Sequence, residues 1–520
     1  MTDPAAGPAP GPVTGPPGAG PPRFRMGVAP AYEQYARGGG PGAHGDHEVH
    51  VIVEIRAEGL DAAVPRRPPQ RSEVIIIDCS GSMAHPTLRK IAAARKAAAA
   101  AIERLPDGTH FALVAGTDTA RLVYPPPGPA GPGTVAASPA SRADGSRTAL
   151  TLDVHGGTRI SAWLSLARRL LTARPGATFR HALLLTDGRD EHGRVEELRR
   201  VLDDCAGEFT CDALGIGADW DAAQLQQIAD RLHGRAEAVV EEGAEGFEDQ
   251  LTRVFGELIG ASTRRTLPQL TLGVRTEPYL EITLFRQVNP TVLDLTDTAV
   301  HDGDRTCFPT GAWGDETRWY ELRMRVDPDH PDHPAHREPH TARIASLRLE
   351  AEGSGDVVLP REEPVTVHWT QEYPPLTDPG VHGRHFQRHA ELQEASWAGS
   401  TALYRDDIPA AERELGKAVR LAHELGATAH LKQLRKLVIV ENAALGRVRV
   451  RDVITPEDVN VVGIMSGHTT PPPSALGGDA GPAEGTTHSD DRPARCSRCR
   501  EWVRPGRFCE NCGHPLGEGR

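Results

Sequence analysis

A carboxylate and two hydroxyl groups lie close together in the run DCSGS, as Asp78, Ser80 and Ser82, and the apolar run VIII precedes them directly. Two further oxygen donors follow later: Thr158 ends the run GGT, and Asp187 follows the apolar run HALLLT. Hydroxyl and carboxylate oxygens of modest total charge suit a hard octahedral cation that keeps bound water, such as Mg²⁺ or its substitute Mn²⁺, and do not suit zinc. The residues predict a divalent-cation site, provided that the fold brings the three segments together.

The same residues also admit a simpler interpretation. Aspartate and serine side chains commonly cap a helix by accepting hydrogen bonds from its free backbone N–H groups, so DCSGS alone is equally compatible with a helix cap and a turn. The preceding apolar run and the two later loops, GGT and LLLTDG, favour the cation site. His181, Arg189 and His192 flank this region without ligand spacing, and we interpret them as surface polar residues.

Four cysteines near the end of the sequence form a second candidate metal site. Cys496 and Cys499 make one C-x-x-C pair, and Cys509 and Cys512 make another. Two such pairs supply the thiolates of a tetrahedral zinc ribbon, here over residues 495–516, and leave no position open for water. The alternative is a coincidental group of free cysteines. We expect a structural Zn²⁺ that provides most of the folding free energy of this small module.

The segments that carry the first site alternate between apolar strands and amphipathic helices. We predict strands at residues 74–78, 110–116, 181–186 and 209–217, and helices at residues 86–104, 158–173, 194–204 and 221–232. Strict alternation is typical of an α/β fold, in which a Rossmann-like, doubly wound parallel sheet has helices on both faces. Ligands of such sheets bind at the carboxyl ends of the strands, where the oxygen donors lie. This domain is expected to span residues 73–262.

The rest of the chain divides by composition and by hydrophobic period. The 54 glycines and 44 prolines indicate long connecting segments. Residues 125–147 form a proline-rich loop that we interpret as a solvated insertion, with a place in the partner surface as the alternative. The other expected parts are a disordered Pro/Gly-rich tail (1–45), a strand segment that pairs with the later β domain (46–72), a β-sandwich-like domain (263–372), a small helical bundle (380–450) and a flexible linker (466–494).

Charge and composition exclude several classes of protein. A formal net charge of −13 argues against extensive binding to nucleic acid or to an acidic membrane, because both need a positive field. The sequence has no basic start followed by an apolar stretch and no run of about 20 apolar residues, so neither a signal peptide nor a membrane helix is predicted. The uneven cysteines do not resemble a secreted disulfide framework, and we expect a cytoplasmic protein.

The pattern D-x-S-x-S, with a threonine from a later loop and an aspartate after a further apolar strand, resembles the von Willebrand factor A (VWA) family. All five positions of the family's metal-ion-dependent adhesion site (MIDAS) are matched. The resemblance implies that Ser80, Ser82 and Thr158 bind the ion directly or nearly so, and that Asp78 and Asp187 act largely through bound water. It also implies an open coordination position that an Asp or Glu of a protein partner fills.

Residues 46–450 are similar to a group of actinobacterial VWA proteins in which a β domain and helices follow the VWA domain. The resemblance lies in GGTRISAWLSLA, RHALLLTDGRDEH, FTCDALGIGADW and CFPTGAWGDETRWYEL. Such proteins are often encoded beside phosphoserine/threonine signalling components, which implies a signalling role. The proline-rich start and Arg159 depart from the group, and a guanidinium beside Thr158 could recruit a partner carboxylate or crowd the ion.

One main hypothesis and one alternative follow. We expect a non-enzymatic, intracellular interaction or scaffold protein of a signalling complex, which binds an acidic residue of its partner through Mg²⁺ at the MIDAS. The alternative is a non-ATPase co-subunit of an AAA+ complex of the chelatase or MoxR type, since VWA domains recur there and the sequence has no GxxxxGK[ST] motif. No nucleophile elbow, HExxH helix or evident acid/base pair indicates an enzyme. Phosphorylation of Thr469 or Thr470 would offer a docking site for a forkhead-associated domain.

Overall fold

The computed structural model describes these residues of the 520-residue chain: 21–29, 34–35, 48–62, 69–84, 90–128, 133–190, 195–217, 219–239, 246–333, 340–352, 357–370, 380–472, 474, 494–495 and 502–503. The chain forms two units, residues 1–476 and 477–520. In the second unit, the short strands β21 (Ala494–Arg495) and β22 (Trp502–Val503) pair antiparallel. No helix in the described part is long and apolar enough to cross a membrane. The predicted zinc ligands lie outside the described residues: Cys496, Cys499, Cys509 and Cys512.

The α/β domain is built on one sheet with the strand order β10-β9-β8-β4-β5-β6, and β7 also pairs with β5. The strands from β10 to β5 pair in parallel, whereas β6 and β7 run antiparallel to β5. The α/β prediction is confirmed, but a fully parallel sheet is wrong at this edge because a hairpin follows β5. The bounds are β4 (Arg71–Asp78), β5 (His110–Gly116), β6 (Ala120–Tyr124), β7 (Val135–Ala136), β8 (Phe179–Thr186), β9 (Thr210–Ile216) and β10 (Ala236–Val239).

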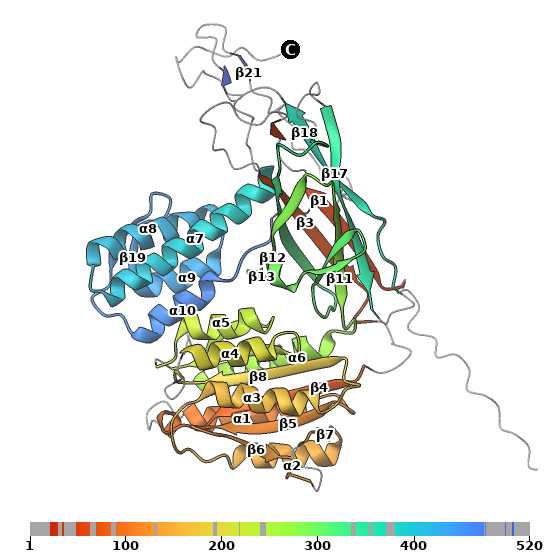
Figure 1. Ribbon diagram of the computed structural model, residues 1–520. Helices are drawn as coiled ribbons and strands as arrows, with labels where there is room; N and C mark the ends of the chain where they lie inside the picture. Colours follow the sequence, from red (N-terminus) through yellow and green to blue (C-terminus); the bar gives the residue numbers. More distant parts are fainter. Residues whose placement is uncertain are drawn as a thin grey trace, which may run out of the picture. The chain divides into compact units, whose positions relative to one another are not determined.

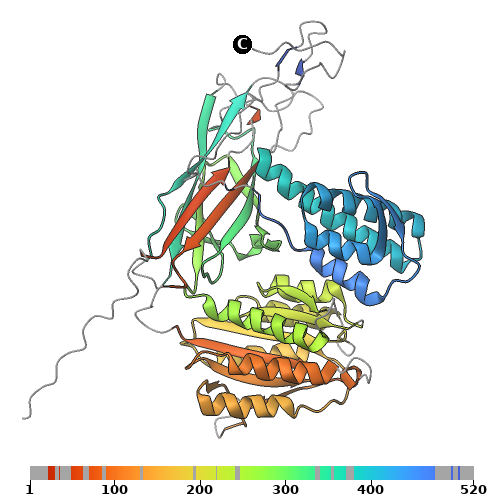
Figure 2. The ribbon, with the colours of Figure 1, turned by 180° about the vertical axis from the view of Figure 1, so that it is seen from behind.

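Helices cover both faces of this sheet, with α3, α4 and α5 on one face and α1, α2 and α6 on the other (Figures 1 and 2). Successive side chains of a strand point to opposite faces. In β4, Val74 and Ile76 therefore pack with the first group and Ile75 and Ile77 with the second, and all four are fully buried. The bounds are α1 (Lys90–Glu103), α2 (Pro139–Leu150), α3 (Ile160–Thr172), α4 (Val195–Cys205), α5 (Ala222–Arg231) and α6 (Phe247–Arg264).

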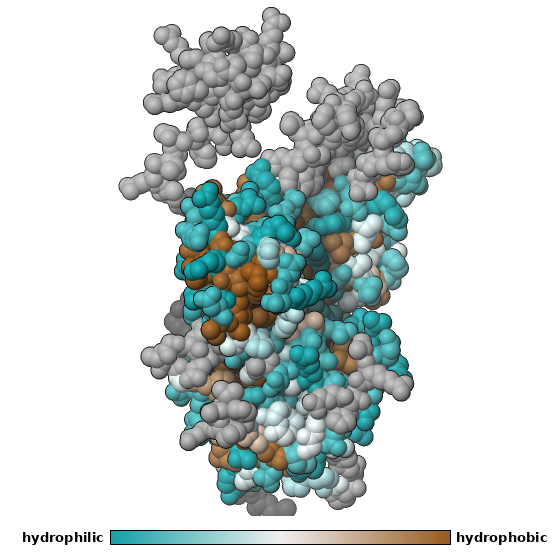
Figure 3. Space-filling model, turned by 90° about the vertical axis from the view of Figure 1, so that its left-hand side faces the viewer, coloured by the Kyte–Doolittle hydropathy of each residue, from teal (hydrophilic) through white to brown (hydrophobic). Residues whose placement is uncertain are grey.

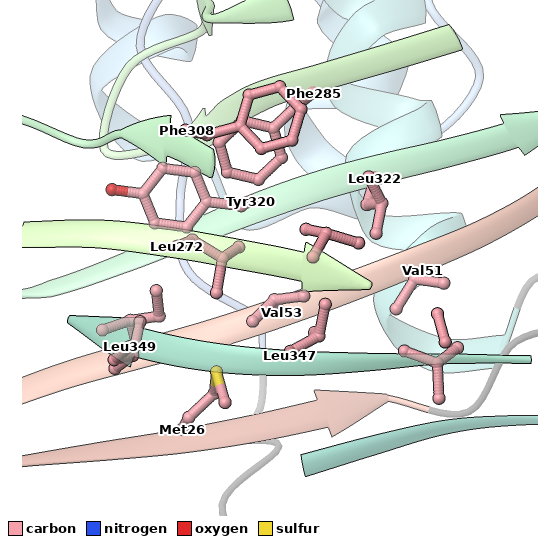
Figure 4. Packing of buried hydrophobic residues seen from close by; sticks show 14 of the residues in the cluster. Met26, Val51, Val53, Leu272, Phe285, Phe308, Tyr320, Leu322, Leu347 and Leu349 are labelled. Atoms are coloured by element: carbon pink, nitrogen blue, oxygen red, sulfur yellow. The ribbon is translucent and has the colours of Figure 1, made fainter. Parts of the chain in front are cut away.

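A β-sandwich-like domain consists of one sheet with the order β1-β3-β16-β12-β13 and another with the order β14-β15-β11-β17-β18-β2. Both sheets fill one core, and Figure 4 shows Val51 and Val53 of the first sheet near Leu272 and Leu347 of the second. The bounds are β1 (Arg23–Ala29), β2 (Gln34–Tyr35), β3 (Glu48–Glu58), β11 (Leu270–Thr276), β12 (Leu280–Asn289), β13 (Leu293–Asp294), β14 (Val300–Asp302), β15 (Arg305–Pro309), β16 (Thr317–Val326), β17 (His340–Ala351) and β18 (Glu363–Thr370).

Strand β1 corrects the prediction that residues 1–45 form a disordered tail. It pairs antiparallel with β3 along its whole length. Its sequence RFRMGVA alternates, and Phe24 and Met26 lie in the core of the β-sandwich-like domain. The strand was not predicted because its alternation is short and the residues around it are rich in proline and glycine. β3 in turn pairs antiparallel with β16.

Helix α2 corrects the interpretation of residues 125–147 as a solvated insertion, because the second part of this segment folds. Ser138 caps the helix in a capping box with Ser141, and a proline follows the cap. A Cβ atom at position 145 would lie 2.9 Å from the ring of Phe111, so Gly145 allows the helix to approach β5 closely.

The helical region contains a hairpin that the sequence did not predict. The run VIVEN, which we expected to continue a helix, forms strand β19, since consecutive β-branched residues favour a strand. Figure 3 shows a hydrophobic patch on the side of the molecule where α8 and β19 lie. Exposed large hydrophobic residues of this region are Tyr404, Ile408, Ile439, Leu445 and Val453. The bounds are α7 (Gly380–Tyr404), α8 (Ile408–Glu424), α9 (Thr428–Leu437), β19 (Val438–Asn442), β20 (Arg447–Val450) and α10 (Pro456–Ser466).

The predicted flexible linker, residues 466–494, is fixed along its first residues. Thr469 Oγ1 donates a hydrogen bond to the Val288 carbonyl at 2.6 Å, and Thr470 Oγ1 lies 2.9 Å from His389 Nε2. The preceding helix α10 packs against the α/β domain, where its apolar residues share a core with α5. Both threonines considered as phosphorylation sites therefore have their hydroxyls engaged.

Candidate metal centre

Three loops meet at the carboxyl end of the parallel strands. The backbone N–H of Gly81 donates to the Gly156 carbonyl at 3.0 Å, and that of His155 donates to the Cys79 carbonyl at 2.8 Å. These bonds hold the DCSGS loop against the GGT loop. Because β8 pairs in parallel with β4, Asp187 follows β8 at the same edge of the sheet.

Asp78, the last residue of β4, has hydrogen bonds to both carboxylate oxygens. Oδ1 accepts from the Ser80 backbone N–H at 2.8 Å, and Oδ2 accepts from the Thr186 hydroxyl at 2.7 Å. Burial raises the pKa of Asp78 to about 6, and the charge of Asp187 adds to the rise, while the hydrogen bonds oppose it. A bound cation would favour the ionised carboxylate and lower this pKa.

Ser80, Ser82 and Asp187 form a hydrogen-bonded chain. Ser80 Oγ lies 2.9 Å from Ser82 Oγ, which donates to Asp187 Oδ1 at 2.7 Å. Ser80 and Asp187 are buried, whereas Ser82 is exposed. The cluster therefore opens to solvent at Ser82.

Thr158 approaches this cluster from the loop before α3. It is buried, and a Cβ atom at position 188 would lie 3.1 Å from its hydroxyl oxygen, so Gly188 leaves room for the loop beside Asp187. The structure thus brings all five predicted residues to one edge of the sheet. Arg159, whose role was open, forms an ion pair with Glu197 of α4.

Lys90, the first residue of α1, completes the cluster and was missed by sequence reasoning. Its Nζ lies 2.7 Å from Asp187 Oδ2, and its side chain is 3% exposed. The carboxylate of exposed Asp219 is more distant, at 3.9 Å. Within the segment RKIAAARK, this lysine looks like an ordinary surface residue of a helix, so no local signal marks the ion pair.

The donor set fits a hard divalent cation, because it combines three hydroxyls with two carboxylates. Burial raises the pKa of the nearby Cys79 thiol to about 12, so this thiol stays protonated and does not offer a zinc ligand. Among the described residues, no group of three or more His, Cys, Asp or Glu side chains could hold a metal ion. The candidate site therefore depends on its hydroxyl groups.

Comparisons with known proteins agree with this fold. A family model described as von Willebrand factor type A domain matches residues 73–238. The solved structure of a von Willebrand factor type A protein from Catenulispora acidiphila is 30% identical, covers 88% of this chain and 99% of its own, and has a TM-score of 0.72. The chain belongs to the von Willebrand factor type A family. The match also agrees with the predicted actinobacterial VWA group.

A more distant match is an uncharacterized protein from Synechocystis, 23% identical over 341 residues, which are 64% of this chain and 73% of that protein. VWA domains commonly bind a divalent cation at a MIDAS and mediate contacts between proteins. The three loops bring together here the five residues that the sequence resemblance assigned to a MIDAS.

A second buried cluster lies at the opposite ends of the same strands. His181 Nδ1 lies 2.5 Å from Glu73 of β4, and Nε2 lies 3.3 Å from Asp212 of β9. Burial lowers the pKa of His181, but the two carboxylates outweigh it and raise this pKa to about 10. The interpretation of His181 as a surface residue beside the cation site is wrong, because it is buried and belongs to the amino ends of the strands. His192 lies outside the described residues.

Proposed function

We propose that this protein recognises an acidic residue of a protein partner through a divalent cation, Mg²⁺ or its substitute Mn²⁺, at the MIDAS. The observation that carries the proposal is the meeting of five oxygen-donor side chains from three loops at an edge of the sheet that opens to solvent. Membership of the VWA family, whose domains commonly mediate contacts between proteins, supports it.

Each side chain has a role in this proposal. The hydroxyls of Ser80, Ser82 and Thr158 would bind the cation, and Asp78 and Asp187 would hold its water ligands. The cation supplies an electrophilic position for the carboxylate of the partner. The chain's own hydrogen bonds fix Asp78, and exposed Ser82 marks the side from which the partner approaches.

We propose an interaction or scaffold role in an intracellular signalling complex, without enzymatic activity. In the candidate site, the hydroxyl chain ends on a carboxylate that is already paired with a buried lysine. This arrangement would hold a cation in place, and the proposed role requires no step of bond making or breaking. We also propose that the terminal cysteines hold a structural Zn²⁺.

A pull-down from native lysate, analysed by mass spectrometry in Mg²⁺ and in EDTA, tests the proposal. The wild type is compared with Ser80→Ala combined with Ser82→Ala, and with Thr151→Ala, which removes an exposed hydroxyl directly after α2 as a control. Partners lost both in EDTA and in the double variant support metal-dependent recognition. Zinc content is measured in parallel, because EDTA also removes zinc.

Partners that the double variant and EDTA leave unchanged would contradict the proposal and would place the binding surface elsewhere, with the hydrophobic patch of the helical region as the next candidate. Recovery of an AAA+ ATPase in the metal-dependent set would instead favour the co-subunit alternative.

A further inference from the structure

Lys90 adds a fixed positive charge to the cation site. Its Nζ contacts one oxygen of Asp187 at 2.7 Å, and the other oxygen of Asp187 accepts a hydrogen bond from Ser82. Gly217, which has a φ of +73°, makes room for the lysine, since a Cβ atom there would lie 2.9 Å from Nζ. The backbone at the end of β9 is therefore shaped to accept this side chain.

The sum of the charges decides what the cluster can bind. Ionised Asp78 and Asp187 with protonated Lys90 leave one negative charge in excess. A divalent cation turns this into one positive charge in excess, and the carboxylate of a partner then brings the cluster to neutrality. Because uncompensated charge is unfavourable in a buried site, the state with both cation and carboxylate is the most favourable one.

We propose that Lys90 couples the two ligands: it weakens binding of the cation alone and strengthens binding of a carboxylate to the cation-loaded site. This inference rests on the proposed function and adds that stable loading requires the anionic partner. Coupling between two ligands is reciprocal, so a carboxylate tightens cation binding by the same factor by which the cation tightens carboxylate binding.

A lysine with a purely structural role would behave differently. If Lys90 only held Asp187 in place, replacing it would release that carboxylate from its position, and the affinity for the cation would fall. The coupling role gives the opposite sign, because removing the positive charge raises the affinity for the cation. The direction of the change separates the two roles.

Mn²⁺ binding to the full-length protein, measured from the electron paramagnetic resonance signal of free Mn²⁺ with and without acetate, tests the coupling. In the wild type, acetate is expected to tighten Mn²⁺ binding by about fivefold or more. Lys90→Gln, which keeps a hydrogen-bond donor, is expected to bind Mn²⁺ alone about tenfold more tightly, with little further effect of acetate. Lys90→Arg keeps the charge and should retain the coupling.

The double variant Ser80→Ala with Ser82→Ala lacks two of the proposed ligands, so the Mn²⁺ that it still binds is bound outside this site. Circular dichroism verifies that each variant is folded. Unchanged or weaker Mn²⁺ binding by folded Lys90→Gln overturns the role of Lys90 and leaves the proposed function standing. Mn²⁺ binding by the wild type in acetate that does not exceed that of the double variant overturns both. If Lys90→Gln does not fold, the wild type alone decides, because an absence of acetate enhancement overturns the coupling.

Discussion

The two ends of strands β4, β8 and β9 each hold a pair of buried carboxylates beside a buried cationic side chain. At the amino ends, His181 lies between Glu73 and Asp212 and contacts both. At the carboxyl ends, Lys90 contacts Asp187, while the second carboxylate has hydrogen bonds from a backbone N–H and a hydroxyl. The same strands thus carry two clusters of similar composition.

The clusters differ in how far the protein itself balances their charge. At the amino ends, Arg235 adds a further cation 3.5 Å from Asp212, so fixed side chains compensate both carboxylates. At the carboxyl ends, Lys90 is the one cationic side chain that forms an ion pair with either carboxylate among the described residues. The exposed Ser82 opens this cluster to solvent. A compensated buried cluster suits stability, whereas an incompletely compensated and accessible one suits the binding of a charged ligand.

The largest expected effect comes from removing the central cation of the amino-end cluster. His181→Ala leaves two buried carboxylates without their shared partner, and the free energy of unfolding should fall by about 3–5 kcal/mol. Urea denaturation measures this change. His301→Ala, which removes an exposed histidine of β14, is the control and should stay within about 0.5 kcal/mol of the wild type. Equal effects of the two substitutions would contradict a structural role for the cluster.

Neutralising a carboxylate should have opposite consequences at the two ends. Asp78→Asn should weaken Mn²⁺ binding by about tenfold or more. It should change the metal-free stability by less than about 1 kcal/mol, because burial makes the charged carboxylate less favourable here than in the unfolded chain. Glu73→Gln should destabilise the protein by about 1–3 kcal/mol and leave Mn²⁺ binding unchanged. Titration with Mn²⁺ and urea denaturation of both variants measure this contrast. A shared pattern would remove the distinction between the clusters.

The pH dependence of stability should identify the amino-end cluster. The pKa of His181 is about 10 in the folded protein, above the ordinary value of 6.5. The stabilisation is complete below the unfolded-state pKa and is lost as pH rises through the folded-state pKa. Urea denaturation of the wild type between pH 7 and pH 9 should show falling stability, and His181→Ala should show a flatter profile. Identical profiles would argue against a protonated His181.

The smallest effect is expected for Arg159, although it directly follows a predicted ligand. Its partner is Glu197, and both side chains are partly exposed. Arg159→Ala should change stability by at most about 1 kcal/mol and Mn²⁺ affinity by less than about twofold. A large gain in Mn²⁺ affinity, measured by the same titration, would show instead that the guanidinium crowds the ion.

The sequence predicts the elements whose hydrophobic pattern is local and complete. The runs VIII and ALLL are apolar without interruption because strands that are buried on both faces need apolar side chains on both, and they form the centre of the sheet. Strand β1 was missed because its alternation is short and prolines and glycines surround it. The run VIVEN was assigned to a helix because an apolar stretch of this length fits either period.

The candidate site shows the same limit. Asp78, Ser80 and Ser82 are neighbours in the sequence, so their spacing could be recognised directly, and the later runs GGT and LLLTDG added Thr158 and Asp187. The position of the Lys90 side chain depends on its ion pair with Asp187 and on the space beside Gly217. These two residues follow strands β8 and β9, far from Lys90 in the sequence. A buried ion pair between distant segments leaves no spacing in the sequence, and only the folded chain identifies it.

Strands β3 and β16 pair although the whole α/β domain lies between them in the sequence. The α/β domain is thus an insertion within the β-sandwich-like domain. During synthesis, β3 leaves the ribosome long before β16, so the inserted domain can fold while β3 still lacks this neighbour. Once folded, the insertion replaces a very long flexible loop and reduces the entropy lost when β3 and β16 come together. The topology therefore favours an order of folding, in which the α/β domain precedes the completion of the domain that surrounds it in the sequence.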